Sequence, residues 1–293
     1  SFPTRRSSDL VFWKHPRSSE ALVRQWERKI SRWTSVPFLL EEVHRRMLGR
    51  AEIMRPVDGG VLVQGWMHAQ TLQQLRGQFD GRTIHLLNPA PWPSSAHPIA
   101  PSVDRDPSIS GKFKHFLSKV VANTPAQSGL PVHCLVHAGG GDLPLPDSSQ
   151  ALVWSPLWLH QVDDPKRLMA QWHRVLKSDG GVFFTCFGPD TAKELHSFAS
   201  ALGQKLPDFS DMHDLGDALV AERFSDPVMD MEYLTLDYEQ PKLLLGDVEA
   251  LKLANANPHF EAEISDLPQK LTLEIVYGHA WALGKHLADR KSV

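Results

Sequence analysis

Short apolar runs alternate with amphipathic stretches along the middle of the chain. Branched or aromatic runs bounded by turn residues predict buried strands, and apolar residues spaced three and four apart predict helices with one buried face. The clearest helical stripe comprises Leu168, Met169, Trp172, Val175 and Leu176, and Asp179-Gly180-Gly181 is expected to end that helix. By these criteria the sequence predicts strands at 61–63, 84–87, 132–136, 151–154 and 182–185 and helices at 68–78, 112–123 and 163–177.

The residues before the first predicted strand are polar and helix-prone. Within 18–50, apolar residues recur at helical spacing, as at Leu22, Trp26 and Ile30. A turn at 56–60 leads into the first predicted strand, and the proline-rich stretch 89–111 is expected to be a loop.

The alternation of strands and helices predicts an α/β fold, with a mostly parallel sheet covered by helices on both faces. In such sheets ligands bind beyond the carboxyl ends of the strands, where the strand order reverses beside the first strand. A binding site is therefore expected within 64–68, 87–90, 138–143 and 154–158.

The two ends of the chain are related at the level of DNA. One back-translation of residues 1–10 is TCT TTC CCT ACA CGA CGC TCT TCC GAT CT, and the reverse complement of its last part encodes residues 289–293. Both ends are predicted to derive from a sequencing adapter and to lie outside the native fold. They carry four basic and two acidic residues, so 27 of 31 basic and 32 of 34 acidic residues remain, and the net charge becomes −5 instead of −3.

Composition narrows the class of protein. The negative net charge gives no basic face for nucleic acid, and no apolar run approaches the roughly 18 residues of a membrane span. The two cysteines, Cys134 and Cys186, give no disulfide framework. These features are typical of a globular cytoplasmic protein that binds neither nucleic acid nor membrane.

Several short motifs follow one another in the second half of the chain. They are Asp142-Leu-Pro-Leu-Pro-Asp147, Gly188-Pro189-Asp190-Thr191, Lys193-Glu194-Leu195, and the runs 211–217, 226–230 and 277–281. In this order and spacing they resemble the malonyl-carrier-protein O-methyltransferases of biotin synthesis, a branch of the class I methyltransferases that use S-adenosylmethionine (SAM). The resemblance covers 142–238 most closely and 271–281 more thinly.

The resemblance implies a Rossmann-like class I methyltransferase fold, with seven strands, helices on both faces and an antiparallel last pair formed by 227–238 and 271–277. The predicted division of the chain is a helical segment at 11–55, from the helical spacing described above, and a methyltransferase-like domain at 56–288. The implied activity is methylation of the free carboxyl of a malonyl thioester, with SAM as cofactor and an acyl-carrier protein or acyl thioester as partner. The alternative is a non-catalytic homologue that acts as a binding or regulatory subunit.

Class I methyltransferases hold SAM with three structural devices. A glycine-rich turn follows the first strand, an acidic residue ends the second strand and binds the ribose hydroxyls, and a polar residue follows the third strand. Residues after the fourth strand line the cofactor. The positions of this chain that align with these devices are Gln64, Gly65, Trp66, Asn88, Gly139, Asp142 (if its loop is shifted by three residues), Ser155 and Leu157.

All three devices are weakened in this chain, the third because Gly139 stands where an acidic or polar residue is expected. Trp66 and Met67 stand where small residues are expected, and Asn88 can bond to a ribose only without a formal charge. Two interpretations stay open: an altered pocket binds SAM with Trp66 stacked on a ring, or Trp66 and Met67 fill the former pocket as core. No catalytic residue is predicted, because a malonyl carboxylate is already an ionised nucleophile that needs no general base.

Other chemically suggestive motifs are expected to be structural. In a strand, Cys134 points away from His133 and His137, so a three-ligand metal site is not expected. The run 139–141 lacks the lysine and spacing of a phosphate-binding loop. Asp211 is expected to cap a helix, and His213 and His279 are expected to be structural histidines.

Overall fold

The computed structural model describes residues 38–53, 56–65, 67, 69–88, 132–136, 142–162, 164–201, 206–250 and 267–282. Within these ranges the strands form one sheet of seven, in the order β3-β2-β1-β4-β5-β7-β6. The strands are β1 (Gly60–Gln64), β2 (Ile84–Asn88), β3 (Val132–Val136), β4 (Gln150–Ser155), β5 (Leu176–Phe187), β6 (Phe224–Asp237) and β7 (Lys270–Ala282).

The strand directions confirm the predicted fold class. β3, β2, β1, β4 and β5 pair in parallel, whereas β7 is antiparallel to both β5 and β6. The predicted antiparallel segments 227–238 and 271–277 fall in β6 and β7. Because β1 lies between β2 and β4, the order reverses there, and the carboxyl ends of these three strands meet at the switch point.

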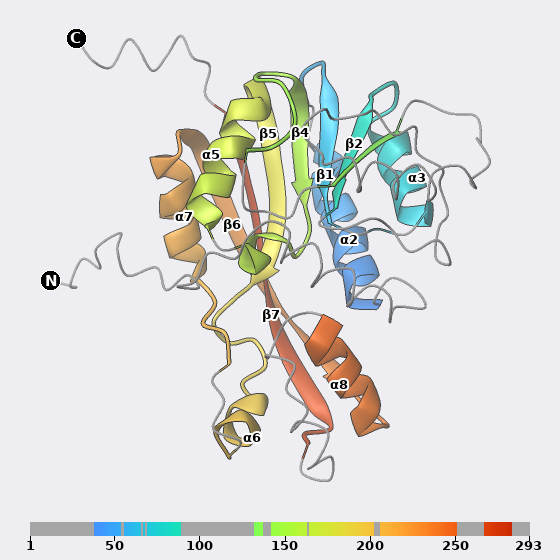
Figure 1. Cartoon of the computed structure of the whole chain (residues 1–293), viewed down its shortest axis with the longest axis vertical. Helices are drawn as coiled ribbons and strands as arrows, with labels where there is room; N and C mark the ends of the chain where they lie inside the picture. Colours follow the sequence, from blue (N-terminus) through green and yellow to red (C-terminus); the bar gives the residue numbers. More distant parts are fainter. Residues whose placement is uncertain are drawn as a thin grey trace, which may run out of the picture.

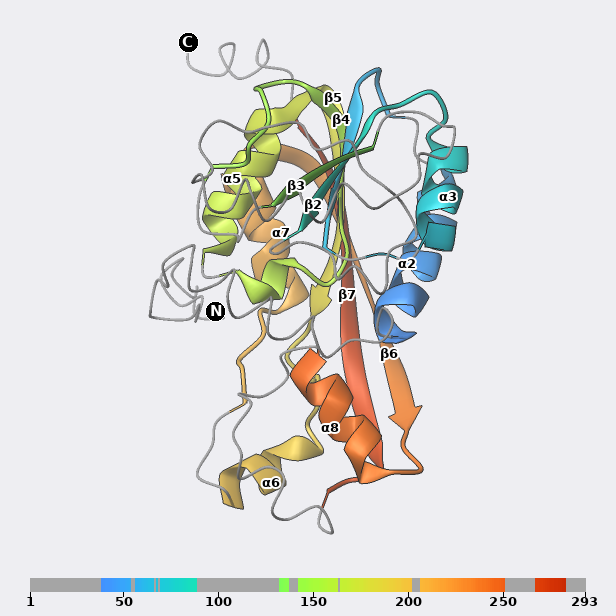
Figure 2. The same ribbon diagram turned by 45° about the vertical axis from the view of Figure 1, so that its right-hand side comes forward.

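Helices cover both faces of the sheet, which Figure 2 shows nearly edge-on. One face carries α2 and α3, and the opposite face carries α5 and α7 (Figures 1 and 2). The predicted helix at 112–123 and the first part of the predicted segment 11–55 lie outside the described residues. The helical elements are α2 (Phe38–Arg50), η2 (Ala51–Ile53), α3 (Ala69–Gln78), η4 (Leu159–Gln161), α5 (Pro165–Val175), α6 (Leu195–Ala201), α7 (Met212–Ala221) and α8 (Pro241–Ala250).

β6 and β7 extend beyond the carboxyl ends of the parallel strands, and α8 lies beside this extension (Figure 1). The hydroxyl of Tyr238, which follows β6, donates to the Asp247 carboxylate of α8 at 2.9 Å. Burial, ahead of the nearby Asp247 charge, raises the pKa of Tyr238, so its hydroxyl keeps the proton that it donates.

The start of α5 follows its sequence signals. Asp164 caps the helix by accepting the backbone N–H of Arg167 at 2.9 Å, and Pro165 occupies the first turn, where its missing N–H costs nothing. Leu168, Met169, Trp172 and Val175 are buried, so the predicted apolar stripe faces the sheet.

The end of α5 was predicted wrongly. The helix ends at Val175, and Asp179-Gly180-Gly181 lies inside β5 instead of capping the helix. The backbone N–H groups of Ser148 and Ser149 donate to the carbonyls of Arg174 and Val175 at 3.0 and 2.9 Å. Residues just before β4 thus donate hydrogen bonds to the last carbonyls of the helix. β5 begins at Leu176, well before the predicted strand 182–185.

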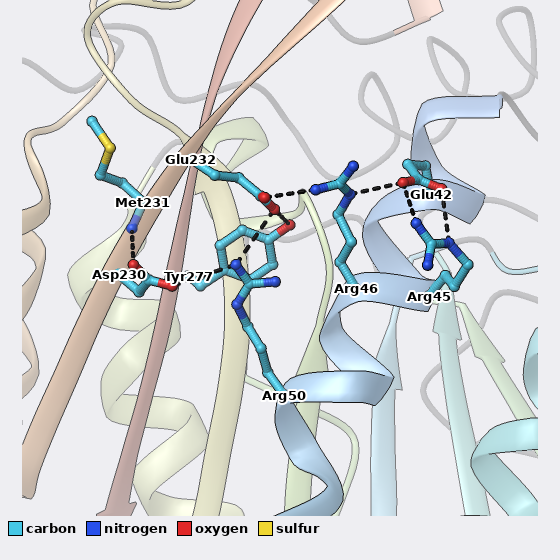
Figure 3. A network of polar contacts seen from close by, with 8 residues as sticks. All are labelled: Glu42, Arg45, Arg46, Arg50, Asp230, Met231, Glu232 and Tyr277. Atoms are coloured by element: carbon cyan, nitrogen blue, oxygen red, sulfur yellow. Dashed lines mark hydrogen bonds and ion pairs between the residues drawn. The ribbon is translucent and has the colours of Figure 1, made fainter.

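A network of charges joins α2 to β6 and β7 (Figure 3). Arg46 bridges Glu42 of its own helix at 2.8 Å and Glu232 of β6 at 2.6 Å. Tyr277 donates its hydroxyl to Glu232 at 2.5 Å, and the Arg50 guanidinium carbon lies 3.9 Å from the centre of the Tyr277 ring. Arginine and carboxylate thus alternate along the contact, which orients α2 across the sheet.

The inner side of α2 packs on the carboxyl-terminal halves of β4 and β5. His44 is fully buried, and its Nδ1 accepts the indole N–H of Trp154 at 3.2 Å. Met47 is also buried, with its sulfur 3.9 Å from the Thr185 hydroxyl. α2 therefore forms part of the core beside the carboxyl-terminal halves of β4 and β5.

Candidate functional site

The candidate site lies at the carboxyl ends of β1, β2 and β4. Gly65 follows β1 and donates its backbone N–H to the Leu87 carbonyl of β2 at 3.0 Å, which brings it level with Asn88. On the other side of β1, Val63 is in register with Trp154, so the next residues, Gln64 and Ser155, follow at one level. The fold therefore brings four of the predicted site residues together on three adjacent strands.

Three buried polar side chains at these strand ends have unused hydrogen-bonding atoms. Gln64 is 1% exposed, and its Oε1 accepts the indole N–H of Trp172 at 2.6 Å, whereas its Nε2 has no partner. Asn88 Oδ1 and Ser155 Oγ are likewise without partners. Buried polar atoms left unpaired cost roughly 1–3 kcal/mol each. A donor, an acceptor and a hydroxyl in this place suit a polar ligand.

The turn after β1 requires a glycine. Gly65 has a φ of +90°, a conformation that other residues adopt only with strain. A Cβ at this position would make only ordinary van der Waals contacts, 3.7 Å from the Pro156 carbonyl and the Trp158 ring, so the backbone angle alone requires glycine. The single glycine that remains in this turn is therefore the one whose backbone angle demands it.

The loop after β4 is held by a side chain of β5. Leu157 is buried and has a φ of +45°, unusual for a branched residue. Its backbone N–H donates to the buried hydroxyl of Thr185 at 2.9 Å, which fixes the loop beside Ser155. The backbone of Leu157 thus sets the course of this loop, whereas its side chain packs in the hydrophobic core.

We expect Thr185→Val to lower the free energy of unfolding by about 1–3 kcal/mol, because the buried N–H of Leu157 then has no acceptor. Valine keeps the shape of threonine, so the loss reports the hydrogen bond rather than the packing. Chemical denaturation of the two proteins measures it. Equal midpoints would show that the Leu157 loop does not depend on this hydroxyl.

Other predicted site residues lie elsewhere or outside the described residues. Asp142 is exposed, and its carboxylate pairs with Arg167 of α5 at 3.1 Å. Met67 is 5% exposed and belongs to the core, as the second interpretation of the turn expects. Trp66 and Gly139 lie outside the described residues.

A small pocket on the α5 and α7 side was not predicted from the sequence. Its volume is about 30 Å³, enough for one or two water molecules. The His160 ring lies 4.5 Å from the Phe187 ring and 5.7 Å from the Phe209 ring, measured between centroids. The lining residues are Leu159, His160, Val162, Pro165, Cys186, Phe187, Asp208, Phe209, Ser210 and Leu215. They come from the segment after β4, the start of α5, the end of β5, and the segment that leads into α7 together with Leu215 of that helix, so no short sequence motif unites them.

The remaining motifs have structural roles where they are described. Asp211 accepts the backbone N–H of His213 at 2.8 Å, which confirms the predicted cap of α7. His279 lies edge-on to Phe183 and Trp281, and burial lowers its pKa. Among the described residues there is no cluster of metal-ligating side chains, and His137 lies outside them. Nor is any helix in the described part of the chain long and apolar enough to cross a membrane.

Comparison with known proteins relates this fold to one enzyme family. Residues 112–184 match the family described as "Methyltransferase domain". The malonyl-[acyl-carrier protein] O-methyltransferase of Laribacter hongkongensis is 33% identical over 275 residues, which cover 87% of this chain and 86% of that protein. Its counterpart in Gallionella capsiferriformans is 38% identical over 171 residues, covering 52% of this chain and 58% of the relative.

Solved structures are more distant in sequence. The YcgJ protein of Bacillus subtilis is 14% identical, with a TM-score of 0.47 over 82% of this chain and 99% of that one. The relative from Laribacter hongkongensis, by contrast, aligns along most of both chains. On that alignment, the chain belongs to the malonyl-[acyl-carrier protein] O-methyltransferase family.

Proposed function

We propose that this protein methylates the free carboxyl group of a malonyl thioester on an acyl-carrier protein, in biotin synthesis, with SAM as methyl donor. The observation that carries the proposal is the set of unpartnered buried polar atoms on Gln64, Asn88 and Ser155 at the switch point. Family membership supplies the substrate class, since the relatives are named for malonyl-[acyl-carrier protein].

The strand-end residues suit the parts of SAM. Asn88 Oδ1 can accept hydrogen bonds from the ribose hydroxyls of SAM. The Gln64 amide and the Ser155 hydroxyl can donate hydrogen bonds to other polar groups of SAM. Gly65 lets the backbone approach closely. When bound, SAM supplies an electrophilic methyl group. The protein's task is to orient the two reactants and to exclude water, because the carboxylate attacks without help from a base.

Calorimetric titration of SAM into the whole chain tests the cofactor, and methyl ester formation on malonyl-acyl-carrier protein tests the reaction. We expect binding at micromolar Kd, about −8 kcal/mol, and an ester product. A folded protein that releases no heat up to millimolar SAM, and forms no ester, would contradict the proposal.

We expect Asn88→Asp to tighten SAM binding about tenfold, because charge-assisted hydrogen bonds to hydroxyls are roughly twice as strong as neutral ones. Asn88 is 6% exposed, so the new carboxylate also lowers the stability of the free protein. Calorimetric titration measures the Kd of SAM for the native protein and for Asn88→Asp. Asn88→Leu, which removes the acceptor, serves as the opposite control. An unchanged Kd in both variants would place the ribose elsewhere.

A second candidate function is a non-catalytic binding subunit. Burial of Met67 and the uncharged side chain of Asn88 favour it, since both weaken the usual cofactor site. The same titration separates the two functions, because a binding subunit of this kind takes up no SAM.

A further inference from the structure

A buried carboxyl group lies behind the turn that follows β5. Glu274, in the middle of β7, is 5% exposed, although glutamate is rarely buried without a specific partner. Its Oε2 accepts the backbone N–H of Asp190 at 2.7 Å. Burial raises the pKa of Glu274, and the Asp190 N–H opposes that rise. A buried carboxyl directed at one backbone N–H is an arrangement that fixes a loop.

The turn itself is bound to β7 by its backbone. Thr191 N–H donates to the Gly188 carbonyl at 3.1 Å, which closes a turn with Pro189 at its second position, where proline is favoured. Gly188 N–H donates to the Glu274 carbonyl at 2.9 Å. The Thr191 hydroxyl bonds to both the carbonyl and the N–H of Glu274, at 3.0 and 3.1 Å. The Glu274 carboxylate adds a contact to the backbone of Asp190 in the middle of the turn.

Gly188 is matched to Glu274 in size as well. A Cβ on Gly188 would lie 2.6 and 2.7 Å from the two carboxylate oxygens of Glu274, too close for any real contact. With the Glu274 carboxyl held in its present place, position 188 has room only for glycine, and a larger residue would displace the carboxyl from the turn.

The turn continues directly from the pocket wall. Cys186 and Phe187 line the pocket, and Gly188 is the next residue. Phe187 in turn packs against His160 and Phe209. A shift of the turn would thus move the end of β5 and open or close the pocket.

We propose that Glu274 is a positioning residue, which fixes the turn 188–191 and thereby the end of β5, at the sheet edge where the malonyl thioester binds. The small pocket around His160, Phe187 and Phe209 marks this edge and itself has room only for water. This inference rests on the proposed function for its substrate. The pocket lies at the carboxyl ends of β4 and β5, beside the strand ends that offer polar atoms to SAM. Cofactor and substrate then occupy neighbouring sections of one sheet edge.

The test compares Glu274→Ala, which removes the acceptor, with Glu274→Gln, which keeps an acceptor oxygen for the Asp190 N–H. We expect Glu274→Ala to raise KM for malonyl-acyl-carrier protein about tenfold, equivalent to about 1.4 kcal/mol, while kcat and the Kd of SAM change less than about twofold. Glu274→Gln is expected to restore most of the KM. Asp247→Ala is the matched control, because Asp247 is a partly buried carboxylate that accepts one hydrogen bond from Tyr238 beyond the turn.

A second measurement does not depend on activity. Amide hydrogen exchange at Asp190 is expected to be slow in the native protein and in Glu274→Gln, and at least tenfold faster in Glu274→Ala. Unchanged exchange, or an unchanged KM in a folded Glu274→Ala protein, would overturn the positioning role. If the native protein forms no ester at all, the proposed function fails, and the exchange experiment still decides whether Glu274 fixes the turn.

Discussion

Replacing Trp172 by alanine is expected to lower the free energy of unfolding by about 3–5 kcal/mol. Trp172 is fully buried in α5, and its ring lies 5.6 Å from that of Phe184 in β5. The substitution leaves a cavity between helix and sheet, and it removes the partner of the Gln64 amide oxygen. Urea denaturation of both proteins, compared at equal m-value, measures the loss.

Trp172→Phe separates the two effects of that substitution. Phenylalanine keeps an aromatic ring against Phe184 but has no N–H for Gln64. We expect a smaller loss of stability, about 1–2 kcal/mol, together with a several-fold weaker affinity for SAM, because Gln64 is no longer held at the end of β1. If SAM binds Trp172→Phe as it binds the native protein, Gln64 does not depend on α5 for its function.

The sequence was most informative where one physical signal dominates. The apolar runs at 61–63 and 84–87 predicted β1 and β2 within a residue of their observed limits, since runs this short, bounded by turn residues and rich in Val, Ile and Leu, favour a strand buried on both faces. The end of α5 was missed, because the carbonyls of Arg174 and Val175 are taken up by residues that precede β4. A contact between segments so far apart in sequence overrode the local helix-ending signal at 179–181.

In the candidate site, too, local sequence predicted some features, whereas others depend on contacts between distant segments. Position after a strand was enough to predict that Gln64, Asn88 and Ser155 lie together, because the carboxyl ends of parallel strands share one edge. The partner of Gln64, the indole of Trp172, could not be predicted, since the two residues are 108 positions apart. Glu274 gave no signal either. The Glu274 carboxyl has a structural role only because the pairing of β5 with β7 places Gly188 next to it, and that pairing could not be predicted from local sequence.

Gly278→Ala is expected to destabilise the protein by about 3 kcal/mol, near the upper end of the usual cost of overpacking a core. Gly278 lies in β7, in register with Phe184 on one side and Met229 on the other. A Cβ at this position would overlap the Phe184 ring and approach the Met229 sulfur at 3.1 Å. The ring cannot retreat, because Phe184 is fully buried and packs against Trp172.

The reason for this cost is tested by a double mutant and a control. Phe184→Leu removes the ring atoms that the new methyl group meets, so Gly278→Ala is expected to cost about 1–2 kcal/mol less in that background than in the native one. Gly246→Ala in α8 adds the same methyl group where no atom lies within 4 Å, and it is expected to raise stability by about 0.5–1 kcal/mol. Equal costs of Gly278→Ala with and without Phe184 would mean that β7 yields around the methyl group, and that glycine is not required for the close approach of β5 and β7.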